Sequence, residues 1–144
     1  MACITVLGAG MMGTALTWPL ADREHQIRLV GTHLDTDIVH ELKSGHVHPK
    51  LKLPIPSGIE TFGVDELDRA MDGTDLVVLG VSSAGVRWAA NKLSPLLRPG
   101  AAVLMVSKGL EWDGTTLRVL PDVFANALPP ELRGQVFPVA VGGP

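Results

Sequence analysis

The chain of 144 residues has the length of a single domain, because domains commonly hold about 100–200 residues. Hydrophobic residues make up 46% of it and aromatic residues only 4%, a composition typical of strands buried between helices. The net charge of −3 and the scattered lysines and arginines argue against a nucleic-acid or anionic-membrane surface. No apolar stretch reaches about 18 residues and no basic leader precedes the first one. We therefore expect no membrane span, no signal peptide and a cytoplasmic location.

The chain opens with a predicted strand, a glycine-rich turn and a predicted helix. Residues 4–7 are apolar and rich in β-branched side chains, which indicates a buried strand. The single Cys3 cannot form an internal disulfide, and we expect it to be a small buried residue in a reducing compartment. A helix is predicted over residues 11–21, with a kink or an early end because Pro19 lacks a backbone donor. Residues 26–30 alternate polar and apolar and predict the second strand.

The middle of the chain alternates weaker elements with one long loop. Residues 35–44 carry apolar side chains at helical spacing and predict a helix, with Asp35 as its N-cap. Residues 46–58 hold three prolines and predict an irregular loop. Residues 59–62 predict a third strand, and a short helix is expected over residues 65–71, capped by its first residue.

The second half contains the most apolar predicted strand, over residues 76–81. A helix over residues 84–97, a strand over 102–106, a helix over 115–127 and a strand over 136–141 follow. Parallel neighbours need crossover connections, and helices separate these strands throughout. The sequence therefore predicts an α/β fold with a doubly wound, mainly parallel sheet of about six strands between two helical layers.

The segment Gly8-Ala9-Gly10-Met11-Met12-Gly13 has the pattern G-x-G-x-x-G between the first predicted strand and the first predicted helix. The pattern alone is weak evidence, but this position is the one that a dinucleotide-binding turn of a Rossmann-like domain requires. Gly8 permits a tight turn, Gly10 lets the backbone approach a pyrophosphate, and Gly13 lets the helix lie close to the strand. Amides at the helix start would then bind the phosphates. The alternative is a glycine-rich turn without a ligand.

The end of the second predicted strand lacks the acidic residue that usually binds the ribose of NAD. It reads Val30-Gly31-Thr32-His33, and the first carboxylate, Asp35, is interpreted as the helix cap. A 2′-phosphate would not be repelled there, and Thr32 and His33 could hydrogen-bond to it. The predicted cofactor is therefore NAD or NADP.

Other polar and aromatic residues receive plainer interpretations. Three histidines lack carboxylates and cysteines at ligand spacing, so no metal is expected and they are interpreted as solvated: His40, His46 and His48. The Ser82-Ser83 turn fits a cofactor contact and a helix cap equally well. The tryptophans are interpreted as packing residues: Trp18, Trp88 and Trp112.

Several segments resemble the N-terminal domain of the bacterial and archaeal NAD(P)-dependent glycerol-3-phosphate dehydrogenases. The resemblance covers the opening strand and glycine turn, the Pro-rich loop and the strand over residues 76–81. Its most specific segment is Val106-Ser107-Lys108-Gly109-Leu110-Glu111, directly after the fifth predicted strand. The chain closes with Gly143-Pro144, where the family has Ser-Gly-Pro.

The resemblance implies roles for individual residues. Met11 and Met12 would contact the cofactor together with the three turn glycines, and Thr32 would lie beside the adenosine ribose. The family's matching loop lies near the cofactor, so His48 and Lys50 could reach the active-site crevice. Lys108 would touch both cofactor and substrate, as a catalytic and substrate-binding residue, and Gly143 would contact the substrate. A lysine at the carboxyl end of a strand can stabilise the negative charge that grows on a carbonyl oxygen during reduction. The alternative for Lys108 is a solvated surface lysine.

The resemblance also implies an oxidoreductase that interconverts sn-glycerol 3-phosphate and dihydroxyacetone phosphate, in glycerol-3-phosphate metabolism and phospholipid biosynthesis. Residues 1–144 would form the NAD(P)-binding domain, and a helical substrate domain with the main catalytic lysine would be absent, leaving this fragment inactive. The partners expected are a small phosphorylated substrate, no nucleic acid and, as an open alternative, a second copy in a homodimer. Two other functions stay open: a related 2-hydroxyacid or ketoacid dehydrogenase, and a non-catalytic dinucleotide-binding module.

Overall fold

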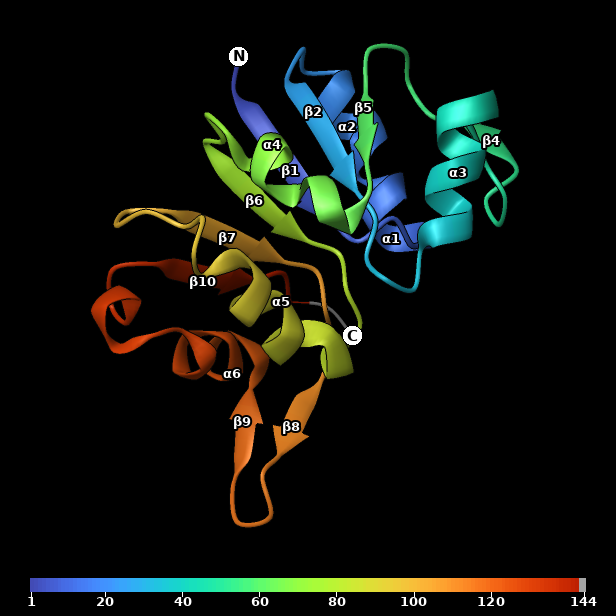
Figure 1. Cartoon of the computed structure of the whole chain (residues 1–144). Helices are drawn as coiled ribbons and strands as arrows, with labels where there is room; N and C mark the ends of the chain where they lie inside the picture. The colour runs from blue at the N-terminus through green and yellow to red at the C-terminus, as the bar shows by residue number, and fades with distance from the viewer. Residues whose placement is uncertain (143–144) are drawn as a thin grey trace.

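The computed structural model describes residues 1–142 and contains a six-stranded parallel sheet with helices on both faces (Figure 1). Across the sheet the strands are β10 (Phe137–Ala140), β7 (Ala102–Met105), β6 (Leu76–Leu79), β1 (Cys3–Leu7), β2 (Gln26–Val30) and β5 (Glu60–Phe62). Every neighbouring pair is parallel. The α/β fold, the doubly wound sheet and all six predicted strands are thereby confirmed.

The order of the strands reverses beside β1. From β1 the chain continues outward through β2 to β5, and then returns to the other side of β1 to add β6, β7 and β10. Ligands of such sheets bind at the carboxyl ends of the strands, where the order reverses. The fold therefore makes the carboxyl ends of β1, β2 and β6 the first place to examine.

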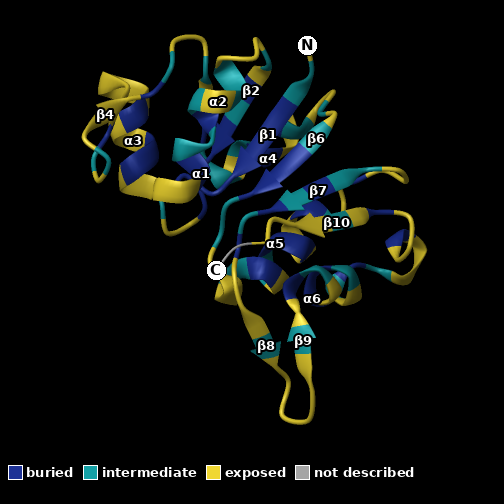
Figure 2. Cartoon of the chain, turned by 180° about the vertical axis from the view of Figure 1, so that it is seen from behind, coloured by how far each residue is buried: buried dark blue, intermediate teal, exposed yellow. Residues whose placement is uncertain are grey.

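Two hydrophobic cores cover the two faces of the sheet, because successive side chains of a strand point to opposite faces. One core lies under α1 (Met11–Ala15), α2 (Thr17–Ala21) and α3 (Thr36–Gly45). The other lies under α4 (Leu67–Met71), α5 (Val86–Leu93) and α6 (Leu120–Ala127). The strands β1, β2 and β6 are buried almost throughout (Figure 2), so their carboxyl ends start from rigid elements. Cys3, predicted to be buried, is a half-buried free thiol at the start of β1.

The first predicted helix is interrupted, as Pro19 led us to expect. Residues 11–21 form the two short helices α1 and α2, which are separated at Leu16. A continuous helix would need an amide at Pro19 and would press its ring against the carbonyl of Ala15. Leu16 keeps a right-handed helical backbone (φ −67°, ψ −19°), so the two short helices follow one another without the hydrogen bond that an amide at position 19 would donate to Ala15.

Two segments differ from the prediction because they form hairpins. The predicted helix over residues 115–127 begins only at Leu120, and β8 (Leu110–Trp112) pairs with β9 (Leu117–Val119) before it. The Asp113-Gly114 turn favours this hairpin, and Pro121 lies in the first turn of α6, where a proline is tolerated. The loop over residues 46–58 is likewise partly ordered, by the pair β3 (Val47–His48) and β4 (Leu53–Pro54).

Smaller corrections concern helix ends. The 3-10 turn η1 (Val64–Glu66) precedes α4, and its N-cap is Gly63, whose amide donates to the Glu66 carboxylate at 3.0 Å. Asp65, the predicted N-cap, is therefore not the residue that caps this helix. The helix predicted over residues 84–97 is shorter, with η2 (Ser83–Gly85) leading into α5. No helix within residues 1–142 is long and apolar enough to span a membrane.

Candidate functional site

A hollow of about 530 Å³ lies at the carboxyl ends of β1, β2 and β6, and we call it the carboxyl-edge hollow. It is lined by residues from the glycine turn, from the segment after β2 and from the segment between β6 and α5: Gly8, Gly10, Thr32, His33, Leu34, Asp35, Gly80, Val81, Ser82, Ala84, Gly85 and Trp88. A smaller hollow of about 270 Å³ lies at the opposite edge of the sheet, around the amino ends of β6 and β7, and contains no predicted site residue. Three of the predicted site residues therefore line the carboxyl-edge hollow: Gly8, Gly10 and Thr32.

The glycine turn is held by very close backbone packing. A Cβ atom on Gly13 would lie 2.0 Å from the carbonyl oxygen of Gly8, and one on Gly8 would lie 2.7 Å from the carbonyl of Gly80. Gly8 also has a φ of +115°, in the region that glycine favours. A Cβ on Gly80 would lie 2.8 Å from the Cα of Gly13. The fold itself therefore requires Gly8, Gly13 and Gly80, and sequence reasoning missed Gly80 because it lies outside the motif.

Gly10 differs from these three glycines. A Cβ atom there would have no heavy atom within 4 Å, and the backbone φ of −66° is one that any residue adopts. Within residues 1–142, no acceptor is recorded for the amides of Gly10, Met11 and Met12, and both methionine side chains are exposed. Nothing in the packing of the fold requires a glycine at position 10. The residue lines the carboxyl-edge hollow.

The end of β2 corrects the interpretation of Asp35. This residue lies at the N-cap position of α3, but its side chain makes no cap hydrogen bond. Its carboxylate instead accepts hydrogen bonds from the Thr32 amide and hydroxyl, both at 2.9 Å, and from the Ala9 amide at 3.2 Å. Thr32 is nearly buried, and its hydroxyl also accepts from the Leu34 amide at 3.2 Å. Thr32 therefore lines the hollow with its hydroxyl already engaged.

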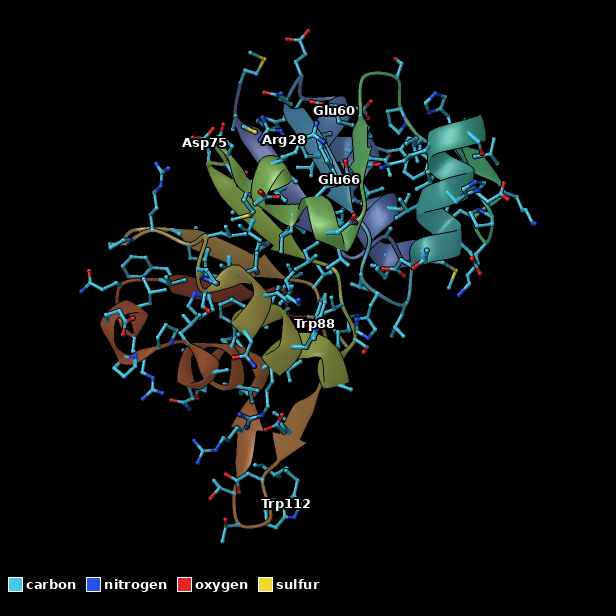
Figure 3. All side chains as sticks on the ribbon, in the orientation of Figure 1. Arg28, Glu60, Glu66, Asp75, Trp88 and Trp112 are labelled. Carbon is cyan, nitrogen blue, oxygen red and sulfur yellow. The ribbon has the colours of Figure 1, made fainter. Side chains whose placement is uncertain are left out.

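The outer wall of the carboxyl-edge hollow is aromatic. Trp88 lies on α5 (Figure 3), and its ring meets that of His33 edge to face, with ring centroids 5.0 Å apart. Both residues line the hollow. Trp88 also contacts the core under α5, and Trp18 is half-buried in the other core, so packing roles fit both. Trp112 does not fit its predicted packing role, because it is 61% exposed on the β8–β9 hairpin. Ser82 lines the hollow and lies at the N-cap of η2 without a side-chain cap bond.

His48 is the functional candidate that sequence reasoning most misjudged. It was interpreted as solvated, but it is fully buried, while His40 and His46 are exposed. Its ring bonds the carbonyl oxygen of Ala9 at 2.9 Å, so the loop over residues 46–58 is fastened to the glycine turn. No group of three His, Cys, Asp or Glu residues within the described chain is arranged to hold a metal.

Lys108 lies in the exposed segment that follows β7, at the same edge of the sheet. The preceding Ser107 is nearly buried and donates its hydroxyl hydrogen bond to the carbonyl oxygen of Val81 at 2.5 Å. Since Val81 lines the carboxyl-edge hollow, this bond anchors the Lys108 segment beside it. Gly143, the predicted substrate contact, lies outside the described residues.

Comparison with known proteins gives a consistent result. Residues 3–142 match the family described as NAD-dependent glycerol-3-phosphate dehydrogenase N-terminus. The NADP(+)-dependent glycerol-3-phosphate dehydrogenase of Archaeoglobus fulgidus is 36% identical over 142 residues, which cover 98% of this chain and 41% of that protein. The Glycerol-3-phosphate dehydrogenase [NAD(P)+] of Bacillus pumilus is 32% identical over 143 residues, 98% of this chain and 39% of that protein.

The solved structures agree with the sequence relatives. The crystal structure of glycerol-3-phosphate dehydrogenase from Coxiella burnetii has a TM-score of 0.82 and 27% identity, covering 99% of this chain and 41% of that one. The chain spans about two fifths of the length of the curated relatives that it matches.

Proposed function

Because this chain belongs to the NAD-dependent glycerol-3-phosphate dehydrogenase family, we propose that it binds the cofactor for an enzyme that interconverts sn-glycerol 3-phosphate and dihydroxyacetone phosphate. The observation that carries the proposal is Gly10, which faces the carboxyl-edge hollow with an unpaired amide and no neighbour that would exclude a side chain. A pyrophosphate lying against the backbone gives the physical reason for a glycine there.

The residues of the turn fit a dinucleotide. Gly8 and Gly13 form the tight turn, and the amides of Gly10, Met11 and Met12 would bind the phosphates. The adenosine end would extend past Thr32 toward His33 and Trp88, which line the far part of the hollow. The cofactor is NAD or NADP, and when bound it supplies or accepts the hydride.

We further propose that NADP is bound at least as tightly as NAD. Among the described residues that line the hollow, the only carboxylate is that of Asp35, whose Oδ2 atom accepts three hydrogen bonds from Thr32 and Ala9. These bonds hold the carboxylate against the backbone, and the end of β2 carries Thr32 in place of the acidic residue that usually binds the ribose hydroxyls of NAD. The Archaeoglobus relative is named for NADP(+), in agreement with this proposal. Calorimetric titration with NADH and NADPH measures the ratio of their dissociation constants. Clearly tighter binding of NADH would contradict the proposal.

Lys108 is proposed as the residue of this chain that acts on the substrate. Its ammonium group would bind the phosphorylated substrate beside the cofactor and stabilise the charge that develops on the carbonyl oxygen. Gly143 would add a substrate contact. The main catalytic lysine would belong to a helical domain beyond this chain, so residues 1–144 alone should bind cofactor without turnover. We expect the whole enzyme to be cytoplasmic and to bind no nucleic acid, and a homodimer stays an open alternative.

Calorimetry with the Gly10→Ala variant tests the cofactor site. The substitution should leave the fold unchanged, because the new methyl group meets no atom, yet it should weaken NADPH binding at least about tenfold by blocking the backbone approach. Gly45→Ala is the matched control, since Gly45 also has open space around its Cβ position but lies at the end of α3. Equal NADPH affinity of the native chain and Gly10→Ala would remove the turn from the cofactor site.

A further inference from the structure

We propose that His48 is a positioning residue that fixes the direction of the Gly10 amide and thereby the affinity of the turn for the cofactor pyrophosphate. This inference rests on the proposed cofactor site and adds a residue 39 positions away from the turn, in a loop outside the glycine motif. Three features support the inference: the hydrogen bonds of His48, the geometry of one peptide unit, and the separate anchors of the loop.

The hydrogen bonds assign the tautomer of His48. Its Nδ1 atom accepts the backbone amides of Lys50 at 3.3 Å and Leu51 at 3.1 Å, so Nδ1 carries no proton. The proton of the neutral ring therefore lies on Nε2, which donates to the carbonyl oxygen of Ala9 at 2.9 Å. The side chain is fully buried. Its two nitrogens thus serve two different parts of the chain, the loop and the glycine turn.

The bond to Ala9 controls the amide of Gly10, because both belong to one planar peptide unit. In a trans peptide the C=O and N–H groups point in opposite directions, and the described chain contains no cis peptide. His48 holds the Ala9 oxygen from the buried side, and the Thr14 hydroxyl donates to the same oxygen at 3.1 Å. The Gly10 N–H is therefore turned away from the core, and Gly10 lines the carboxyl-edge hollow. The preceding peptide is also fixed, since the Ala9 amide donates to Asp35.

The loop that carries His48 has anchors of its own. β3 and β4 pair with each other, the Lys52 amide donates to the carbonyl of His48 at 2.8 Å, and the Ile55 amide donates to the carbonyl of His46 at 2.8 Å. Ile55 is buried in the core under α3. The loop can therefore keep its shape when the bond from Nε2 to Ala9 is lost, and the two roles of His48 can be separated by mutation.

Two substitutions separate the bond of His48 to the loop amides from its bond to Ala9. In His48→Asn the side-chain oxygen takes the place of Nδ1 and can accept the loop amides, but no atom reaches Ala9. In His48→Gln the amide nitrogen takes the place of Nε2 and can donate to Ala9, but the loop amides lose their acceptor. We expect His48→Asn to bind NADPH about tenfold more weakly than the native chain, because the charge-assisted hydrogen bond from the Gly10 amide to the pyrophosphate would be misdirected. We expect His48→Gln to bind within about threefold of native while showing the lower melting temperature of the two.

Calorimetry with NADPH and with adenosine, together with thermal unfolding, gives the decisive comparison. Adenosine has no phosphate, so its affinity should be the same in all three proteins. NADPH affinity of His48→Asn equal to that of the native chain would overturn the inference and leave the cofactor site intact. Loss of NADPH affinity in both variants in proportion to their loss of stability would also overturn it, by reducing His48 to a structural role. A folded native chain that binds neither NADH nor NADPH would instead overturn the proposed function, and this inference with it.

A measurement on the native chain needs no variant. Long-range ¹H–¹⁵N NMR spectra distinguish the two neutral tautomers of a histidine, and His48 should be protonated on Nε2. Protonation on Nδ1 would overturn the inference even if His48→Asn failed to fold, because Nε2 could then not donate to Ala9.

Discussion

The glycine turn and the β8–β9 hairpin differ in what their residues contact. In the turn, Gly8, Gly13 and Gly80 approach one another so closely that a methyl group on any of them would meet backbone atoms. In the hairpin, one face carries two cross-strand apolar pairs that are all exposed, Leu110 with Val119 and Trp112 with Leu117 (Figures 2 and 3). The opposite face is held by charged pairs, Arg87 with Glu111 and Arg118 with Asp113.

The difference shows that residue choice has different causes in the two regions. The close packing of the domain explains every glycine of the turn except Gly10, so a substitution there tests either the fold or the ligand. None of the exposed apolar side chains of the hairpin packs into either hydrophobic core of the domain. Substitutions in the hairpin should therefore leave the stability of the domain nearly unchanged, and the predictions below test this contrast.

The largest effect on stability is expected at Gly13. Gly13→Ala places a methyl group 2.0 Å from the carbonyl oxygen of Gly8, and only movement of α1 away from β1 could relieve the overlap. We expect the free energy of unfolding to fall by about 3 kcal/mol, in the upper range for overpacked sites. Urea denaturation of the variant beside Gly10→Ala measures the difference. Equal unfolding midpoints for the two would mean that the turn is not tightly packed.

Lys108, which precedes the hairpin in the chain, should affect catalysis rather than stability. In the full-length enzyme, Lys108→Ala should lower kcat/KM several hundredfold, because removing one charge-stabilising donor costs about 2.7–4 kcal/mol in the transition state. The exposed Lys92 of α5 provides a control with the same change of charge. If Lys108→Ala and Lys92→Ala show the same steady-state kinetics, Lys108 is a solvated surface residue.

A smaller, pH-dependent effect is expected at Asp113 in the hairpin. The hydrogen bond from Arg118, followed by those from the amides of Thr116 and Thr115, holds the pKa of Asp113 well below its usual range. A carboxyl whose pKa is lowered by folding adds stability above its unfolded value, and this contribution is lost as the pH falls through the folded value. Asp113→Asn should therefore lower the melting temperature slightly at pH 7, and the difference should shrink below about pH 3.9. A difference that grows on acidification would contradict this account.

The smallest effect is expected at Trp112. Trp112→Ser removes a large apolar side chain that is mostly exposed, so the free energy of unfolding should change by no more than about 0.5 kcal/mol. Trp88→Ser is the comparison, because Trp88 is half-buried against the core of α5 and α6, and its loss should cost clearly more. Similar destabilisation by the two substitutions would show that the hairpin face contributes to the fold of this domain.

Much of the fold and part of the site followed from local patterns in the sequence. The six strands were predicted by their apolar or alternating residues, and the glycine turn was recognised because its spacing and its position between strand and helix are both local. The interruption of the first helix followed from the chemistry of Pro19 alone. The family was recognised from short segments such as Ser107-Lys108-Gly109, which the comparisons confirmed at the level of the family. Each of these signals extends over a few residues.

Tertiary packing decided the rest, because the remaining features join residues that are far apart in the chain. Gly80 is required only because β6 lies against the turn, and His48 is buried only because its loop folds onto Ala9. Asp35 could be interpreted as a helix cap until the amides of Thr32 and Ala9 were seen to converge on its carboxylate. Hydrogen-bond partners and close contacts are set by how the elements pack against one another, and residue periodicity carries no information about that arrangement.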